Sequence, residues 1–428
     1  MTLTLMDEEW ELLAGFLPEG WRALAAETGA MQRARGAIRS PDTLLQVLLL
    51  HVATGLSLKQ AAARAEVQGL ATLSDVALLK RLRRAEGWLG ALAQRLFATS
   101  RFGGAGPQTP PGRRLRAFDA TTVEEPGSTG TDWRIHYAIR LPEMRCDFYE
   151  VTDHTGGETF TRLPVERGDI ILADRGYGHR AGVAHVLRHH GDVIVRINST
   201  NFPLRQAAAP ETAFALLPHL RRLSGHQPGE WAVQFVADGG PWNARLCAIR
   251  KSLPATERAQ AQLRRDAAKR QRTPRPETLE SAAYTYILTT LAPDVVDTAG
   301  VLELYRARWQ IELCFKRLKS LFRLGHVPKR QDASAHAWIE GKLLTVLLIE
   351  RLLHEARFFP PGDSGSPRRS HWREFLEARD AVLAVLSRPL LPSAFLRAAP
   401  VLGPRLANAK RRRAMWCESA QPLLNSLG

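Results

Sequence analysis

Two aspartates lie within or just after segments whose sequence predicts β-strands. Asp119 follows LRAF in the run 114–123, and Asp174 closes the apolar run IILA. Aspartate is disfavoured in strands and costly to bury, so an acid in such a place usually binds a cation or hydrogen-bond donors. Considered alone, each aspartate is better explained as a turn or helix-cap residue than as a metal ligand. Together, at the ends of neighbouring strands, they predict a metal-binding pair.

A third acid belongs to an amphipathic helix predicted over roughly 299–322. At ~100° per residue, a stripe about 60° wide holds Tyr305, Arg308, Glu312 and Lys319. The adjacent apolar sector consists of Leu304, Ile311, Phe315, Leu318 and Phe322. A helix packed on a sheet by that sector would hold the polar stripe near the strand ends. The alternative is pairing on the helix surface, such as Glu312 with Lys316.

After residue 114 the hydrophobic pattern changes from helical periodicity to strand periodicity. The strands and helices that must position these groups therefore begin there. The β-rich runs, separated by turn residues, are 114–123, 132–141 and 145–153. They are followed by a strand within 168–178, a helix over 180–190, and strands over 192–198 and 284–290. This order predicts a mixed sheet in an α/β fold.

The helical spacing resembles the signature of a known family. Y-x2-R-x3-E-x6-K, here Tyr305, Arg308, Glu312 and Lys319, is similar to the motif of bacterial insertion-sequence transposases of the DDE class. LRAFDATTV and ILADRGYG look like that family's first and second catalytic aspartate motifs, and GTDWRIHYAI (130–139) is similar to its second-strand segment. The match runs in order from about residue 56 to about residue 350.

The resemblance implies an RNase H-like catalytic core in which Asp119, Asp174 and Glu312 are the catalytic acids and the metal ligands. Asp174 and Glu312 are 138 residues apart, far more than a sheet needs to reach its next helix. Transposases of the subgroup that this chain resembles carry a mostly β domain at this point, and 200–283 fits it. Helical N- and C-terminal regions are expected to flank the core.

The predicted reaction is phosphodiester cleavage followed by strand transfer. In-line attack needs charge relief at the attacking and leaving oxygens, which two divalent ions about 3.5–4 Å apart provide. Carboxylate oxygens suit Mg²⁺, and Mn²⁺ should substitute. The resemblance implies that Asp119 bridges both ions, with Asp174 on one and Glu312 on the other. It further implies cut-and-paste movement of an insertion sequence through a DNA hairpin, by a homodimer acting on double-stranded DNA at element ends and target.

Several side chains of the helix are candidates for DNA contacts. Arg308 and Lys319 are placed to hold phosphates beside the cut, and Tyr305 to orient a phosphate or pack against a sugar. In similar transposases a displaced base stacks on tryptophan, and Trp309 matches a tryptophan position inside the helical motif. Trp231 and Trp242 are alternatives, and a packing role is open for all three.

Residues 56–85 have the pattern of a helix-turn-helix. A short helix from Ser57, a turn around Gly69 and a second helix capped by Ser74 are predicted. The second helix carries Lys80, Arg81, Arg83 and Arg84, which suits a DNA groove. The alternative is an ordinary helical bundle with a solvated basic face.

Composition supports a polyanionic partner. The 428 residues contain 59 Lys plus Arg against 43 Asp plus Glu, a net charge of +16. Residues 251–276 alone hold eight basic residues against two acids, which indicates either an exposed arm that lies on phosphates or a solvated charge run.

Four distant cysteines and an acidic N-terminus argue against disulfides, zinc ribbons and secretion, so a cytoplasmic protein is expected.

A Gly/Pro linker at 101–114 marks the first predicted boundary. The predicted domains are a helical DNA-binding domain (1–105), the core in two parts (106–199 and 284–330), a β-rich insertion (200–283) and a helical C-terminal region (331–428).

Two other functions remain open. A repair nuclease on the same fold would share the acids but needs no Tyr-Arg-Glu-Lys spacing. A domesticated, non-catalytic DNA-binding regulator has no need of all three acids. Because no G-x-x-x-x-G-K-[ST] loop is present, ATP use is not expected.

Overall fold

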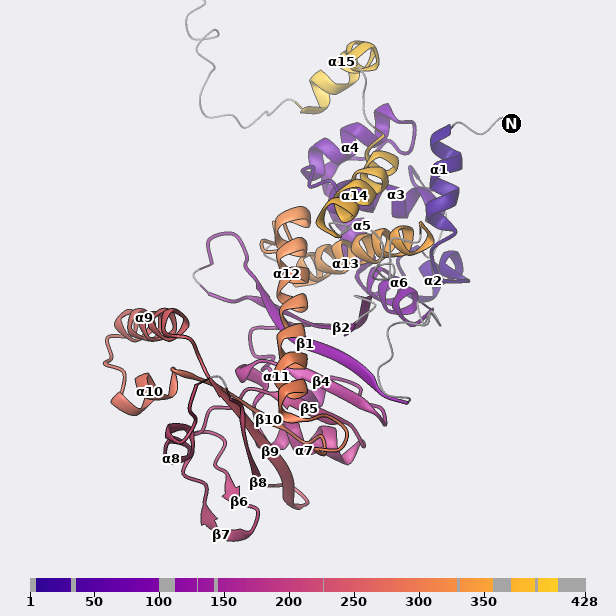
Figure 1. Cartoon of the computed structure of the whole chain (residues 1–428). Coiled ribbons are helices and arrows are strands. Elements are labelled where there is room, and N and C mark those ends of the chain that lie inside the picture. Colours follow the sequence, from indigo (N-terminus) through magenta and orange to yellow (C-terminus); the bar gives the residue numbers. More distant parts are fainter. Residues whose placement is uncertain are drawn as a thin grey trace, which may run out of the picture. The chain divides into compact units, whose positions relative to one another are not determined.

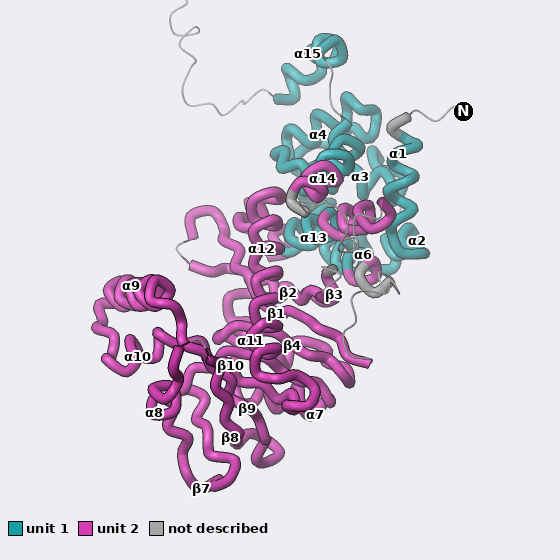
Figure 2. The backbone as a smooth tube through the Cα atoms, in the orientation of Figure 1, with its two compact units in different colours: residues 1–93, 336–345, 379–428 teal, residues 94–335, 346–378 magenta. Residues whose placement is uncertain are grey.

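The computed structural model describes residues 5–31, 36–99, 112–128, 130–141, 145–225, 227–328, 332–356, 371–388 and 392–406. Most of the linker predicted at 101–114 lies outside these residues, as does Cys417. Two compact units are distinguished in Figure 2: residues 1–93, 336–345 and 379–428 form unit 1, and residues 94–335 and 346–378 form unit 2. The five-part division along the sequence stays a prediction.

Unit 2 is built on one ten-stranded mixed sheet, which confirms the predicted α/β class. Its strands are β1 (Arg114–Val123), β2 (Trp133–Leu141), β3 (Arg145–Asp153), β4 (Asp169–Ala173), β5 (Asp192–Val195), β6 (Arg205–Gln206), β7 (Ala209–Ala213), β8 (Gly229–Ala237), β9 (Gly240–Arg250) and β10 (Tyr284–Thr289). The order is β3-β2-β1-β4-β5-β10-β9-β8-β6-β7. The first three strands form the expected antiparallel meander, and β4 and β5 add to it in parallel, as expected for an RNase H-like core.

The apolar runs of the strands form the core of this unit. Every residue of β4 is buried, as expected for a central parallel strand with continuous hydrophobic sequence. One cluster joins Phe118 of β1, Val195 of β5 and Leu288 of β10 to Phe235 of β8. The cluster therefore continues from the first strands into the segment predicted as an insertion.

The segment 200–283 contains helices as well as strands. The β8–β9 hairpin predicted over 231–250 is present and extends the sheet beyond β10. The helices are α8 (Leu216–Arg221), α9 (Leu253–Lys269) and α10 (Pro276–Ser281). The basic stretch 251–276 is therefore largely helical.

The helix predicted over 299–322 is interrupted at Arg308. It consists of α11 (Thr298–Ala307) and α12 (Trp309–Phe322), which run one after the other in front of the sheet in Figure 1. The predicted apolar sector is buried at Ile311, Phe315, Leu318 and Phe322. α11 packs against β5 and β9, and α12 packs against β1, so this sector fixes the helices on the sheet.

Other elements of unit 2 connect the strands. They are the short helices η1 (Phe160–Arg162) and η2 (Arg175–Tyr177) and helix α7 (Arg180–Arg188). Helix α14 (His371–Ser387) is divided between the two units at residue 378. Cys146, Cys247 and Cys314 are buried free thiols.

Unit 1 is helical. It comprises α1 (Leu5–Ala14), α2 (Trp21–Glu27), α3 (Pro41–Val52), α4 (Leu58–Val67), α5 (Asp75–Arg84), most of α6 (Glu86–Thr99), the middle of α13 (Asp332–Glu355) and α15 (Pro392–Leu406). Among the described helices none is by itself long and apolar enough to cross a membrane, although Arg373–Ser387 and Pro392–Leu406, bent by 46°, pass that test as a pair.

The predicted helix-turn-helix is confirmed as local structure. Ser57 caps α4 in a reciprocal capping box with Gln60, and Ser74 accepts a hydrogen bond from the Ala77 amide at the start of α5. The turn contains Gly69 at φ +69°, a left-handed conformation that favours glycine.

Candidate active site

Asp119 and Asp174 lie side by side at one end of the sheet. Parallel pairing of β1 and β4 places Ala117 beside Leu172, and two residues further on both chains reach their aspartates. Asp174 follows the last residue of β4 and caps η2, where it accepts a hydrogen bond from the Gly176 amide at 2.7 Å. Register and chain direction therefore bring the two predicted acids together, although only Asp174 stands at a strand end, because β1 continues beyond Asp119 to Val123.

Glu312 approaches this pair through Arg308. The Arg308 guanidinium donates to Glu312 Oε1 at 2.5 Å, and its other terminal nitrogen lies 3.7 Å from Asp119 Oδ2. The side chains of Arg308 and Asp119 are each 16 % exposed, so this bridge is well shielded from water. The alternative surface pairing of Glu312 with Lys316 is not what the structure contains.

The neighbouring carboxylates affect each other's protonation. Burial and the neighbouring Asp174 raise the pKa of Asp119 to about 7. The Ala120 amide and Arg308 act in the opposite direction without cancelling this rise. Because two adjacent carboxylates repel each other when both are ionised, the pair favours a bound cation.

The donor chemistry of the two aspartates fits a divalent metal ion. Their carboxylate oxygens are hard ligands of the kind that Mg²⁺ takes. Within the described ranges, however, no three Asp, Glu, His or Cys side chains converge closely enough to hold an ion as they stand. The carboxylate of Glu312 is paired with Arg308 instead.

A fourth acid, Glu158, lies beside the pair and was not predicted from the sequence. A Cβ atom built on Gly176 would lie 2.0 Å from Glu158 Oε2 and 3.0 Å from Asp174 Oδ1, so both carboxylates border this glycine. Burial raises the pKa of Glu158, and Asp174 raises it further. Glu158 stands in the loop after β3, where no periodicity marks it; the glycine within ILADRGYG is the one sequence signal of a close approach.

Tyr177 and His136 form a buried layer next to the acids. The hydroxyl of Tyr177 lies 3.4 Å from His136 Nδ1, and His136 Nε2 lies 3.2 Å from the Thr152 hydroxyl. Burial, reinforced by Arg162 and Arg134, lowers the pKa of His136 to about 4. The imidazole is therefore neutral at pH 7 and supplies hydrogen bonds rather than charge.

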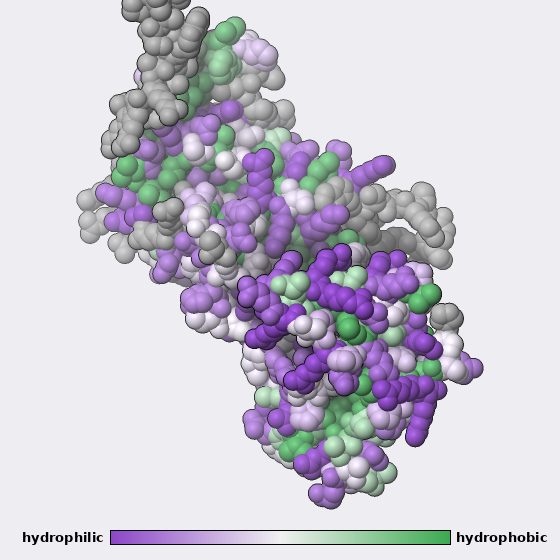
Figure 3. Space-filling view, turned by 90° about the vertical axis from the view of Figure 1, so that its left-hand side faces the viewer, coloured by the Kyte–Doolittle hydropathy of each residue, from purple (hydrophilic) through white to green (hydrophobic). Residues whose placement is uncertain are grey.

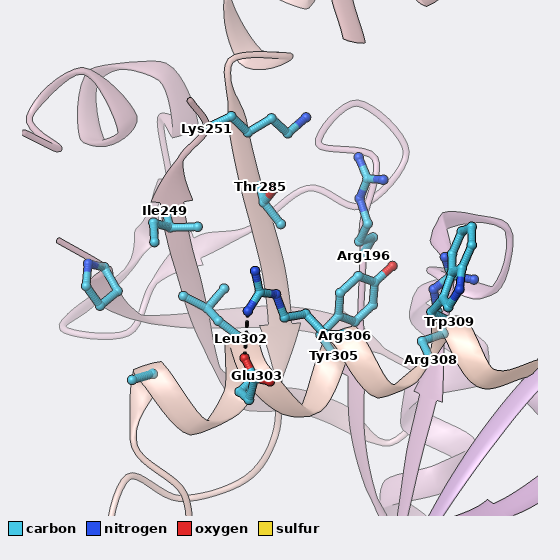
Figure 4. A pocket seen from close by; sticks show the side chains of 12 residues that line it. Arg196, Ile249, Lys251, Thr285, Leu302, Glu303, Tyr305, Arg306, Arg308 and Trp309 are labelled. Atoms are coloured by element: carbon cyan, nitrogen blue, oxygen red, sulfur yellow. Dashed lines mark hydrogen bonds and ion pairs between the residues drawn. The ribbon is translucent and has the colours of Figure 1, made fainter. Parts of the chain in front are cut away.

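A pocket of about 850 Å³ opens along α11, at the end of the helix that leads to the acids. Its lining includes Arg196, Lys251, Tyr305, Arg308 and Trp309. Figure 4 shows the ends of Lys251, Arg196 and Tyr305 facing the same space. Burial lowers the pKa of Lys251, and the nearby Arg196 lowers it further. The buried Tyr305 side chain borders Arg308, whose guanidinium carbon lies 5.6 Å from the centre of the tyrosine ring.

The tryptophans predicted as alternatives differ in exposure. Trp309 is 57 % exposed and lines the pocket. Trp231 and Trp242 are half-buried and pack against the apolar core of unit 2. Trp309 alone among these three is thus open to a ligand at the pocket.

The remaining predicted DNA contacts are Lys319 of α12 and three residues of α5. Lys319 is exposed on α12, and no described acid pairs with it. Lys80 and Arg84 are exposed on α5, whereas Arg81 is half-buried. These exposures suit phosphate contacts at Lys319, Lys80 and Arg84 better than at Arg81.

Comparison with known proteins gives a consistent result. A family model described as "Transposase DDE domain" matches residues 110–348. The transposase for insertion sequence element IS421 of Escherichia coli is 34% identical over 374 residues, which cover 85% of this chain and 99% of that protein. InsL of insertion sequence element IS186A, from Escherichia coli (strain K12), has the same identity over 373 residues with the same coverage. The transposase for insertion sequence element IS231F of Bacillus thuringiensis subsp. israelensis is 23% identical over 203 residues, 44% of this chain and 43% of that protein.

Proposed function

The chain belongs to the DDE transposase family of bacterial insertion sequences, and from this premise we propose that it moves its element by cut-and-paste transposition. In the proposed reaction, Asp119, Asp174 and Glu312 act together at each element end. The observation that carries the proposal is the side-by-side placement of Asp119 and Asp174, with Glu312 tied to Asp119 through Arg308.

We propose that the three acids hold two Mg²⁺ ions, for which Mn²⁺ substitutes. Asp119 and Asp174 supply neighbouring hard oxygens, and Glu312 joins them when Arg308 releases its carboxylate. Such ions, when bound, relieve charge at the attacking and leaving oxygens of a phosphodiester. The protein's own part is to hold Asp119 within a strand, Asp174 at a strand end and Glu312 on a helix.

In this scheme the Arg308 guanidinium has two alternative partners, the Glu312 carboxylate and a DNA phosphate. Without metal, its guanidinium neutralises Glu312 and faces Asp119. When the acids hold cations, the freed guanidinium is in place to donate to a DNA phosphate beside the cut. Arg308 would thus serve as the partner of Glu312 and, where metal ions hold the acids, as a donor to the DNA strand.

The pocket beside α11 supports a hairpin route. Arg196 and Lys251 give it positive charge, and Tyr305 and Arg308 line the same space. A base displaced from the end of the element could stack on the exposed Trp309, which is worth about 1–3 kcal/mol. We therefore propose that the terminal nucleotide of a hairpin end occupies this pocket.

The proposed partners are double-stranded DNA at the element ends and at the target, and a second copy of the chain in the synaptic complex. The exposed basic residues of α5 are the proposed contacts for end recognition, with Arg81 contributing least. The proposed location is the bacterial cytoplasm, on the nucleoid when DNA is bound. ATP has no role in the proposed reaction.

The test uses a duplex that carries the element end and flanking donor DNA, incubated with full-length protein and Mg²⁺. Products are compared on native and denaturing gels. A cut end that runs at double length only after denaturation is a hairpin, and joining to a supercoiled plasmid shows strand transfer. Single nicks without hairpin or joining would favour a nuclease, and specific binding without cleavage in Mg²⁺ or Mn²⁺ would favour a regulator.

A further inference from the structure

We infer that residues 251–283, here called the arm, form a second contact surface for duplex DNA that binds its phosphate backbone beside the pocket. The inference rests on the proposed function, because it assumes that DNA occupies the site. The occupant is the duplex next to the cut rather than the displaced end.

The arm is anchored firmly at its base. It connects β9 to β10, whose residues Arg250 and Tyr284 are paired neighbours in the sheet. The backbone amide of Lys251 donates to the Ala283 carbonyl at 2.8 Å, and its ammonium donates to the Ala282 carbonyl at 2.9 Å. The arm therefore leaves and re-enters the sheet at one closed point, which limits how far its helix can move.

Helix α9, the main element of the arm, contributes little to the core. None of its 17 residues is buried. Its inner side consists mostly of half-buried small residues together with Leu263, and Leu253 at its start is 72% exposed. Helices in proteins gain most of their stability from packing an apolar face, and this one has almost none. We therefore infer that α9 has a role other than packing in the core.

The outer surface of the arm is strongly basic. Its exposed cations are Arg258, Arg264, Arg265, Lys269, Arg270, Arg272 and Arg275. None of these seven forms an ion pair with a described residue. Of the four acids of the arm, Glu280 pairs with Arg221 outside it and Asp266 accepts a hydrogen bond from Gln262. Like charges at this density repel one another, and a polyanion removes that cost. Figure 3 shows hydrophilic side chains in a broad band on the side of the molecule where α9 lies in Figure 1.

The position of the arm connects it to the pocket. Lys251 belongs to the pocket lining, and α9 begins two residues later at Leu253. With a rise of about 1.5 Å per residue, α9 is about 25 Å long, which equals roughly seven base pairs at about 3.4 Å each. A duplex whose end enters the pocket would thus meet the exposed cations of α9 as it leaves.

The test replaces charge without changing helix propensity. Arg264→Gln with Arg265→Gln removes two cations of α9, and glutamine keeps good helix propensity. The matched control is Arg167→Gln with Arg188→Gln, two exposed arginines at the opposite ends of β4 and α7 from Asp174. Each full-length protein is titrated with the element-end duplex at several salt concentrations. Circular dichroism and melting temperature check that each variant is folded.

We expect the arm variant to lower the slope of log affinity against log salt by about 1.8, because each lost phosphate contact removes about 0.9. The control should keep the wild-type slope. Hydroxyl-radical footprints of the arm variant should lose protection on the duplex beside the cut while keeping it elsewhere.

An arm variant whose slope and footprint match the control would overturn the inference. So would loss of self-association in that variant with DNA binding unchanged, since the arm would then contact protein. These outcomes differ from failure of the proposed function, in which the wild-type protein itself would neither cut nor join the element end.

Discussion

Arg308 holds Glu312 in an ion pair of 2.5 Å across one turn of the interrupted helix. The third predicted acid is therefore paired with a cation of its own polar stripe before any metal is present. Because the same guanidinium lies 3.7 Å from Asp119, metal binding at the acids and release of Arg308 are coupled events in the proposed mechanism.

Loss of a proposed metal ligand should abolish cleavage while DNA binding persists. We expect Asp119→Asn, Asp174→Asn and Glu312→Gln each to reduce strand cleavage by roughly 10²-fold or more, because metal stabilisation of the transition state is worth several kcal/mol. Asp294→Asn, in an exposed loop, serves as the control. Near-normal cleavage by any of the three variants would remove that residue from the site.

The metal-free protein should be stabilised by the same Asp119→Asn change at high pH. Asp119 has a pKa of about 7 in the folded protein, against about 3.9 in an unfolded chain. The folded state therefore binds this proton more tightly, and stability falls as pH rises from about 4 to about 7. In EDTA we expect the variant to melt a few degrees above the wild type at pH 8 and the gap to narrow at pH 5. A gap that is equal at both pH values would contradict this account.

Arg308 and Lys319 should matter more for late steps than for the first nick. Neither is a proposed metal ligand, yet both lie on the polar stripe that carries Glu312. We expect Arg308→Ala and Lys319→Ala to leave measurable first-strand nicking and to reduce hairpin formation or strand transfer by a larger factor. Time courses resolved on denaturing gels separate the steps. An equal reduction in the rate of every step would indicate general phosphate binding. Unchanged rates would indicate that both residues belong to a solvated helix surface.

End recognition is best tested in the full chain. An N-terminal fragment would lack α15, which packs on α4 and pairs Arg405 with Glu66. We expect Lys80→Gln and Arg84→Gln each to weaken binding of the element end severalfold and to lower the salt slope by about 0.9. Arg39→Gln, an exposed cation before α3, is the control. Unchanged specificity in both α5 variants would move recognition elsewhere.

Because Glu158 borders Gly176, substitutions at these two residues should have non-additive effects on cleavage. Gly176→Ala would force its methyl group to within 2.0 Å of Glu158 Oε2, so we expect this change to reduce cleavage strongly. Adding Glu158→Ala removes that obstacle and should restore part of the activity, although Glu158→Ala alone lowers it. Strictly additive losses in the double variant would show that Glu158 does not border the site in solution.

Local sequence patterns predicted most of the strands and helix caps correctly. The run IILA predicted a buried strand with Asp174 at its end, and the serines before α4 and α5 predicted both caps. These features depend on residues close in sequence, where side-chain periodicity and capping hydrogen bonds decide the outcome. The continuous helix predicted over 299–322 was wrong at Arg308, because a helical period alone does not reveal a break of the backbone ladder at one residue.

The sequence by itself determined the residue types, their order and the polar stripe that carries Tyr305, Arg308, Glu312 and Lys319. Only the tertiary structure decided which of these groups meet. Strand register brought Asp119 beside Asp174, a loop brought Glu158 to Gly176, and the seating of the helix on the sheet turned Arg308 toward Asp119 while leaving Lys319 exposed. Such contacts join residues far apart in the chain, and their geometry follows from packing, which no local pattern encodes.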